Sequence, residues 1–194
     1  MTTLLNLPLQ QAYPETIRDL QERFPSAHLR VEIREKDVSK ILTEQRFWEI
    51  ISLFDWTDAE NNDRVLEPAV FALATSPVHH IYLFADMLAE KLFTLDAKLY
   101  AENIGDDAYT SDKYFSVDNF LYARCCVIAN GQEAYESVLK NPTLMPKDLT
   151  FESLLSLASK AYFQKTGKRF DYVATTPIET YSNKKGWSKS SWKP

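Results

Sequence analysis

Residues Pro77–Glu102, PVHHIYLFADMLAEKLFTLDAKLYAE, form the longest stretch of the sequence with the periodicity of an α-helix. Its apolar positions recur at steps of three or four residues: Val78, Ile81, Ala85, Leu88, Leu92, Leu95 and Leu99. Side chains at this spacing share one face of a helix, and an apolar face is buried against other elements. Asp86, Glu90 and Thr94 fall on another face, which we expect to meet solvent. The stretch therefore predicts one long central helix over residues 77–102.

Four more segments have helical periodicity and complete the predicted core. They cover about residues 43–54, 63–75, 116–140 and 150–166. Thr43 and Thr150 are predicted N-caps, because a hydroxyl accepts a hydrogen bond from a free backbone amide, and Gly167 is a predicted C-terminal cap. Gly131 follows Asn130 and marks either a break between two helices or a point of close packing. We predict a mainly α protein, a compact bundle of five or six helices.

The first 40 residues have a different pattern and predict a small N-terminal α–β extension. Pro14–Phe24 has the spacing of an amphipathic helix. His28–Arg34 alternates apolar and polar residues, which is typical of a half-buried strand. A single strand needs a partner. Either Tyr172–Thr175 supplies it, or the same strand of a second copy does, which would make a homodimer.

These patterns predict one helical domain over residues 1–172, with the extension at 1–40 and the core at 43–167. Residues 173–194 form an irregular tail in which lysines alternate with aromatic residues. Such a tail can follow a nucleic-acid strand, dock on the acidic loops of its own fold, or stay flexible. We favour self-docking or partial disorder over nucleic acid.

Composition limits the class of protein. Apolar residues make up 45% of the 194 residues and aromatic residues 13%, enough for one sizeable core. The net charge of −5 argues against general affinity for nucleic acid. There is no membrane-spanning run and no basic region at the N-terminus, so we expect a cytoplasmic protein. The adjacent cysteines Cys125 and Cys126 are expected to be reduced, with at least one buried.

The familiar motifs of catalysis and cofactor binding are missing from the sequence. The four glycines are too far apart for a phosphate-binding loop, and no serine has the flanking glycines of a nucleophile elbow. His79 and His80 are adjacent, whereas two helical ligands of one metal ion stand four residues apart. We therefore expect no catalytic residues, no cofactor and no histidine metal site.

Two acidic loops are the remaining candidates for a metal site. They are predicted between helices and carry Asp55, Asp58, Glu60 and Asp63 in the first and Glu102, Asp106, Asp107 and Asp112 in the second. Clustered carboxylates can hold Mg²⁺ or Ca²⁺ if both loops reach the same end of the bundle. Neither loop has the spacing of a dedicated calcium site, and we favour solvated loops.

Arg124 is the charged residue with the most unusual position. It shares one predicted helix face with Phe120, Ile128, Gly131 and Tyr135. A guanidinium on such a face needs a carboxylate or carbonyl partner, or faces a pocket. The structural alternative is pairing within the fold, with Asp86, Asp96 or Glu102 as possible partners. The functional alternative is an anion-binding site, with Arg124, Tyr135, Phe120, Glu102 and Asp112 as candidate residues.

Residues Asp118–Pro142, DNFLYARCCVIANGQEAYESVLKNP, resemble the pattern F-x-x-[FY]-R-x-x-[LI]-I-x-x-G-x-x-x-[FY]-x-x-x-L-x-x-P of a bacterial family called domain of unknown function 4240 (DUF4240). The matching residues are Phe120, Arg124, Val127, Ile128, Gly131, Tyr135, Leu139 and Pro142. Ala123 departs from the aromatic residue that the family prefers. The resemblance covers about residues 43–167 and implies a compact helical fold but no particular chemistry.

The sequence favours a non-enzymatic module that binds another protein, whose identity it does not give, with an immunity-like role as one form. The acidic loops and the N-terminal strand would be its contact surfaces. The grounds are the missing catalytic motifs and an aromatic content beyond the needs of a core. The alternative is a protein or enzyme that binds a small molecule or anion, with Arg124 and nearby carboxylates in a pocket.

Overall fold

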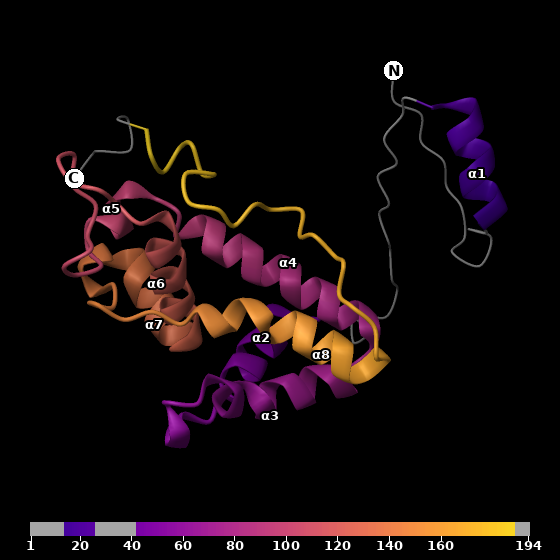
Figure 1. Cartoon of the computed structure of the whole chain (residues 1–194), viewed down its shortest axis with the longest axis horizontal. Coiled ribbons are helices and arrows are strands. Elements are labelled where there is room, and N and C mark those ends of the chain that lie inside the picture. Colours follow the sequence, from indigo (N-terminus) through magenta and orange to yellow (C-terminus); the bar gives the residue numbers. More distant parts are fainter. Residues whose placement is uncertain (1–13, 26–41, 189–194) are drawn as a thin grey trace. The chain divides into compact units, whose positions relative to one another are not determined.

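The computed structural model describes residues 14–25 and 42–188, and the chain divides into two units, residues 1–38 and 39–194 (Figure 1). In the first unit, α1 (Pro14–Arg23) confirms the predicted amphipathic helix. The predicted strand at His28–Arg34 lies outside the described residues. The α–β extension and a homodimer through that strand therefore stay predictions.

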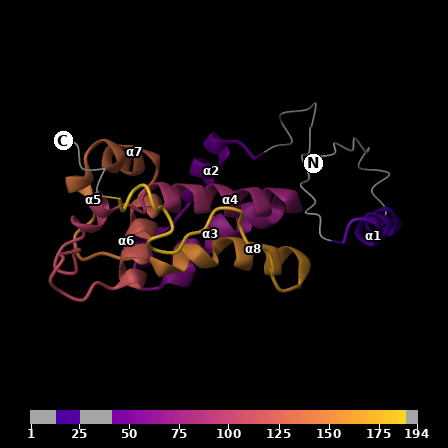
Figure 2. The same cartoon turned by 90° about the horizontal axis from the view of Figure 1, so that it is seen from above.

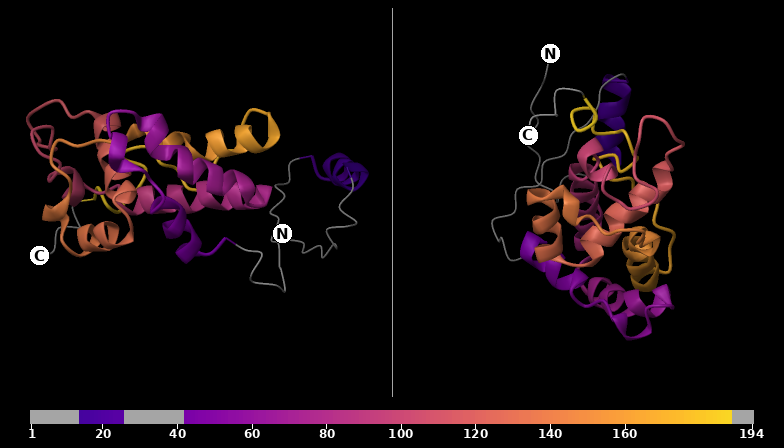
Figure 3. Two further views of the ribbon diagram at one scale, coloured as in Figure 1. Left: turned by 90° about the horizontal axis from the view of Figure 1, so that it is seen from below. Right: turned by 90° about the vertical axis from the view of Figure 1, so that its left-hand side faces the viewer.

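The second unit is built from helices and loops, and its described residues contain no strand. This confirms the predicted mainly α, compact fold. The elements are, in order, α2 (Glu44–Ile51), η3 (Trp56–Asp58), α3 (Asn62–Thr75), α4 (Val78–Thr94), α5 (Lys98–Ala101), α6 (Val117–Ala129), α7 (Gln132–Lys140), η4 (Pro142–Leu144), η5 (Glu152–Ser156) and α8 (Leu157–Thr166). Helices α3, α8 and α4 lie side by side, and α6 packs against the C-terminal half of α4 (Figures 1 and 3).

The buried face of α4 forms the middle of the core, as its spacing predicts. Ile81, Leu88 and Leu92 are buried, together with Phe84. The ring of Phe84 stacks on Phe47 of α2, with 4.8 Å between the ring centroids. Packing of this apolar face, more than local propensity, stabilises a helix of this length in water.

The predicted single helix over 77–102 is wrong at its C-terminal end. Helix α4 stops at Thr94, a turn follows, and α5 begins at Lys98. The backbone amide of Lys98 donates to the carbonyl oxygen of Gly186, at 3.1 Å, instead of to its own helix. Asp96 in the turn is fully buried and also binds the tail. Because the partners of this break lie some 90 residues away along the chain, periodicity alone could not reveal it.

The helix ends agree with the sequence at some positions and differ at others. The hydroxyl of Thr43 accepts from Arg46 N at 3.1 Å and Gly167 ends α8 with φ +68°, which confirms both caps. Thr150 is not a cap, because η5 begins after Phe151, whose amide donates to Tyr122 O. Gly131 is a break rather than a close-packed point, since its φ is +92° and a Cβ there would meet nothing within 4 Å.

The tail docks on its own fold as far as Ser188. From the end of α8 it runs back along α4 toward α5 and α6 (Figure 2). It contacts these helices and the loop between α5 and α6, where the ring of Trp187 lies 5.5 Å from that of Tyr109. The predicted strand partner, Tyr172–Thr175, has no regular structure here and instead binds Asp86 of α4.

Replacing Gly131 with alanine tests the break between α6 and α7. Its φ of +92° and ψ of 179° lie in a region that is almost restricted to glycine, so Gly131→Ala should lower the free energy of unfolding by about 2 kcal/mol. Gly167→Ala is the matched control, because its φ of +68° and ψ of 10° are left-handed helical and less costly, about 1 kcal/mol. Urea denaturation measures both values. Equal losses would contradict this account, since neither added Cβ meets a neighbour.

Candidate functional site

Arg124 lies at the centre of the buried polar structure. Its side chain in α6 is 0% exposed. Nη1 donates to the carbonyl oxygen of Leu92 in α4 at 2.8 Å. Nη2 donates to two tail atoms, Ile178 O at 3.1 Å and Thr180 Oγ1 at 3.0 Å. The guanidinium carbon also lies 4.8 Å from the ring centroid of Phe120, a cation–π distance.

The partners of Arg124 are oxygens of the main chain and of one hydroxyl, rather than a carboxylate. Among the described residues, no carboxylate forms an ion pair with it, so Asp86, Asp96 and Glu102 are not its direct partners. Burial lowers the pKa of Arg124, while the negative charge of Asp96 opposes this shift. Its Nε has no hydrogen-bond partner within the part of the chain that the structure describes. The two Nη atoms of the guanidinium are therefore hydrogen-bonded inside the fold, whereas its Nε is not.

Asp96 is the acidic counterpart of Arg124 and is likewise 0% exposed. Its carboxylate accepts three hydrogen bonds from the tail. The donors are Tyr181 N at 3.1 Å, Asn183 N at 2.9 Å and Trp187 Nε1 at 2.8 Å. These bonds provide the compensation that a buried carboxylate requires.

A third anchor holds the start of the tail. The carboxylate of Asp86 accepts from the Tyr172 hydroxyl at 2.6 Å and from Thr175 N at 3.1 Å. Burial and the neighbouring carboxylate of Asp86 raise the pKa of Tyr172 to about 12. Asp86, Arg124 and Asp96 thus hold successive parts of the tail. Their role in this structure is to attach residues 172–187 to the helical core.

The five candidate binding residues do not form one site. Phe120 and Arg124 stack together and are buried. Tyr135 belongs to a separate cluster, with its ring 5.2 Å from Lys91 Nζ, whose ammonium also pairs with Glu44. Glu102 pairs with Lys98 at 3.5 Å, and Asp112 accepts from the neighbouring Ser111 hydroxyl; both acids are exposed. A shared anion site at these residues stays a prediction.

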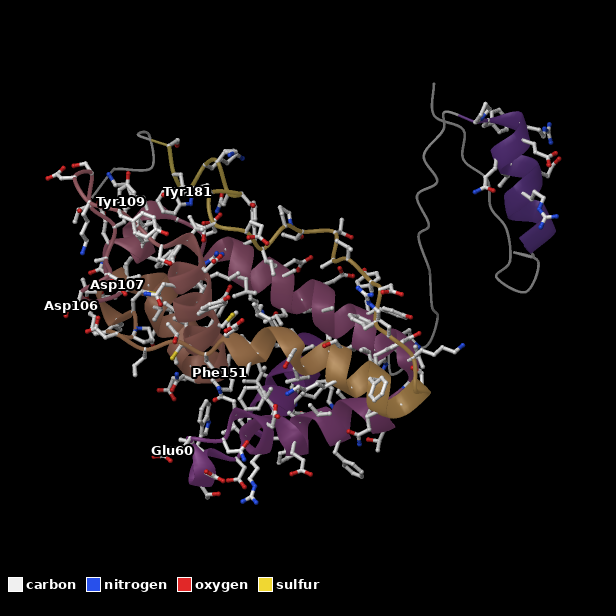
Figure 4. All side chains as sticks on the ribbon, in the orientation of Figure 1. Glu60, Asp106, Asp107, Tyr109, Phe151 and Tyr181 are labelled. Atoms are coloured by element: carbon white, nitrogen blue, oxygen red, sulfur yellow. The ribbon has the colours of Figure 1, made fainter. Side chains whose placement is uncertain are left out.

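The two acidic loops do not come together. Glu60 lies well apart from Asp106 and Asp107 (Figure 4). Within the first loop, Asp58 pairs with Arg64 at 3.3 Å, and Asp63 pairs with Lys160 of α8. No group of three or more potential metal ligands occurs in residues 14–25 and 42–188.

The remaining potential metal ligands occupy ordinary helical positions. His79 and His80 lie in the first turn of α4, with 4.6 Å between their ring centroids and their planes nearly perpendicular. Cys125 and Cys126 are unlinked and both buried in α6. Burial raises the pKa of the Cys125 thiol to about 12. The predicted burial of the cysteines is confirmed.

A shallow hollow of about 510 Å³ lies between α3 and α8 and was not anticipated from the sequence. Its lining residues are Asn61, Asp63, Arg64, Glu67, Val70, Lys160, Phe163 and Gln164. Phe163 is 63% exposed, and Phe71 of α3 is 60% exposed. Phe71 shares a helix face with Arg64 and Glu67, at steps of three and four residues. We call this surface, from Arg64 and Glu67 to Phe71 and Phe163, the α3–α8 face.

A signal for this face is present in the sequence. The buried residues of α3 include Val65, Ala69 and Leu73, and Phe71 does not lie on their side of the helix. Phe163 is likewise outside the buried face of α8. Neither ring takes part in core packing, so both are candidates for contact with another molecule.

A second hollow, also about 510 Å³, lies where the tail leaves α8. Its lining residues are Tyr82, Tyr162, Lys168, Arg169, Asp171 and Tyr172. The rings of Tyr82 and Tyr172 pack together, with 5.0 Å between their centroids. Arg169 pairs with Asp171 at 2.9 Å. Ring packing among α4, α8 and the tail accounts for the three tyrosines, and the ion pair accounts for Arg169 and Asp171.

Comparison with known proteins gives a family but no activity. The family described as Protein of unknown function (DUF4240) matches residues 42–164. No curated protein and no solved structure matches the chain. Of the helices in the described parts of the chain, none has the length and apolar character to cross a membrane.

Replacing Arg124 with methionine separates a structural role from a ligand-binding role. Methionine keeps much of the packing of the stem, but it removes the donor to Leu92 O and Ile178 O and the positive charge that interacts favourably with Asp96. We expect a loss of about 3 kcal/mol, which lowers Tm by about 6–12 °C. Arg124→Lys keeps the positive charge but not the forked guanidinium, so its Tm should lie between that of wild type and that of Arg124→Met. A mutant as stable as wild type that loses a phosphate-dependent rise in Tm would instead indicate an anion site.

The cysteines should react slowly in the native protein. Because the thiolate is the reactive form and burial raises the pKa of Cys125 to about 12, labelling with Ellman's reagent at pH 8 should be at least about 100-fold slower than in urea. Mass spectrometry after alkylation should find both thiols free. Rapid labelling of the folded chain, or a bond between Cys125 and Cys126, would contradict the buried, reduced state.

Proposed function

The chain belongs to the DUF4240 family, and from its exposed surface we propose that it is a non-enzymatic module that binds another protein through the α3–α8 face. The observation that carries the proposal is the pair of exposed phenylalanines, Phe71 and Phe163, at 60% and 63% exposure. Large aromatic side chains held in water on rigid helices are unfavourable for a free protein. They are also the side chains that contribute most to protein interfaces.

The surroundings of these rings have the composition of an interface. The hollow beside them has Val70 and Phe163 in its apolar part. Charged residues form its rim, and Lys160 pairs with Asp63 across the two helices. An apolar centre within a polar rim excludes water from the contact and limits unwanted association. The face is also built on two packed helices, so a partner would meet it with little loss of conformational freedom.

The use of the buried polar groups supports binding over catalysis. Arg124, Asp96 and Asp86 are engaged in holding the tail. An anion site or active site centred on Arg124 would have to displace Ile178 O and Thr180 Oγ1 first. The α3–α8 face needs no such rearrangement, because its aromatic side chains are exposed already.

The acidic loop at residues 55–63 extends this face and suggests the charge of the partner. Asp58 and Asp63 are paired, whereas the carboxylate of Glu60 has no partner among the described residues. Trp56 in the same loop is about half exposed. A partner with apolar and basic residues complements this surface. A toxin would be such a partner in the immunity-like form of the proposal, and the reduced cysteines suit a cytoplasmic location.

Capture from the native host tests the proposal. A tagged wild-type chain should enrich a protein that Phe163→Ser and Phe71→Ser chains fail to enrich. The matched control is Tyr114→Ser, which removes an 88% exposed ring from the loop before α6, away from the α3–α8 face. With the purified partner, loss of one central aromatic side chain should weaken binding by about 2 kcal/mol, or about 30-fold.

The three variants should melt within about 2 °C of wild type, since each changes an exposed side chain. The proposal is wrong if no protein depends on Phe71 or Phe163 for capture. It is also wrong if Tyr114→Ser weakens binding as strongly as the two phenylalanine variants.

A further inference from the structure

The tail occupies a groove whose polar groups belong to another part of the chain. Arg124 and Asp96, both fully buried, lie within residues 42–164, which match the family, whereas Ile178, Tyr181 and Asn183 lie beyond that segment. A buried charge without hydrogen bonds is strongly unfavourable. The tail, which turns at residues 180–181 and 184–187, supplies hydrogen bonds to both charges.

The groove binds four main-chain groups of its occupant. Arg124 donates to the carbonyl oxygen of Ile178, and the carboxylate of Asp96 accepts from the amides of Tyr181 and Asn183. The amide of Lys98 donates to Gly186 O. Carbonyl groups thus face the cation and amide groups face the anion, so the groove fixes the direction of the bound segment.

Two tail residues make the groove selective. Trp187 donates to Asp96, and its ring packs on Tyr181 at 4.4 Å and on Tyr109 at 5.5 Å between centroids. Gly186 lies against the turn after α4, where a Cβ would meet Ala97 Cβ at 2.6 Å and Asp96 O at 2.7 Å. The occupant must therefore carry a glycine followed by a tryptophan, as this tail does.

We propose that this groove is a peptide-binding site that can be filled in trans, and that its occupant is the tail of a second copy of this chain. The tail leaves α8 through Gly167, Lys168 and Arg169, which are all exposed. If two copies exchange tails at this hinge, every contact with Arg124, Asp96 and Asp86 is remade in the partner. Exchange requires that each tail first leave its own groove and that two chains then associate, and the attached tail competes at its high effective concentration.

A labelled peptide of residues 170–188 tests the groove in full-length chains. The receiving chain is Trp187→Ala, whose own tail is weakened and whose groove is intact. We expect saturable binding by fluorescence anisotropy and a rise of Tm toward the wild-type value. Wild-type chain should bind the peptide at least about tenfold more weakly, because its own tail occupies the groove.

Two altered peptides are the controls. Gly186→Ala peptide should not bind, because its methyl group has no room beside Asp96, whereas Lys184→Ala peptide should bind normally, because Lys184 is exposed. If Trp187→Ala does not fold, Tyr181→Ala serves as the receiving chain, since it weakens the tail at a partly exposed residue. No binding to either chain, or equal binding of both altered peptides, overturns the proposal.

Light scattering, which measures molecular mass, tests whether the occupant is the tail of a second copy. Wild-type chain annealed at about 1 mM should contain a dimer that dissociates on dilution, and Trp187→Ala chain should not. A wild-type chain that stays monomeric overturns the second copy as occupant. A dimer that persists unchanged in Trp187→Ala also overturns it, because such a dimer forms through another surface.

Discussion

The guanidinium of Arg124 has five donors, no acceptor and no access to water, and this constraint organises much of the fold. Its fork reaches α4 through Leu92 O and the tail through Ile178 O. One side chain therefore connects three segments that are far apart in the sequence. The position of α6 against α4, and the path of the tail above both, depend on where these oxygens must lie.

Asp96 has the complementary requirement, because a buried carboxylate has only acceptors. The peptide segment between Ile178 and Asn183 supplies both kinds of partner. Its carbonyl and hydroxyl oxygens accept hydrogen bonds from Arg124, and its backbone amides donate to Asp96. Buried charges of this kind add little net stability, but a wrong arrangement leaves one of them unpaired. They therefore favour one path of the tail over its alternatives.

The hydrogen bonds and ion pairs of the polar groups distinguish the residues that hold the fold together from those that are available for binding. The buried acids and Arg124 bind parts of the same chain, and the acids of the first loop pair with Arg64 and Lys160. Phe71 and Phe163 remain exposed on two packed helices. Packing and ion pairing within the chain leave this α3–α8 face unexplained, and association with another protein would explain it.

The sequence by itself determined the features that depend on neighbours along the chain. Period 3.6 located α3, α4 and α6, because a helix must bury one face, and Thr43 and Gly167 marked two helix ends, because local dihedrals and orphan amides decide caps. It also indicated that Arg124 is buried. Only the tertiary structure decided what meets Arg124, why α4 stops at Thr94, and why Tyr135 and Glu102 lie away from Phe120. Those outcomes depend on partners tens of residues distant, and side-chain spacing within one helix carries no information about them.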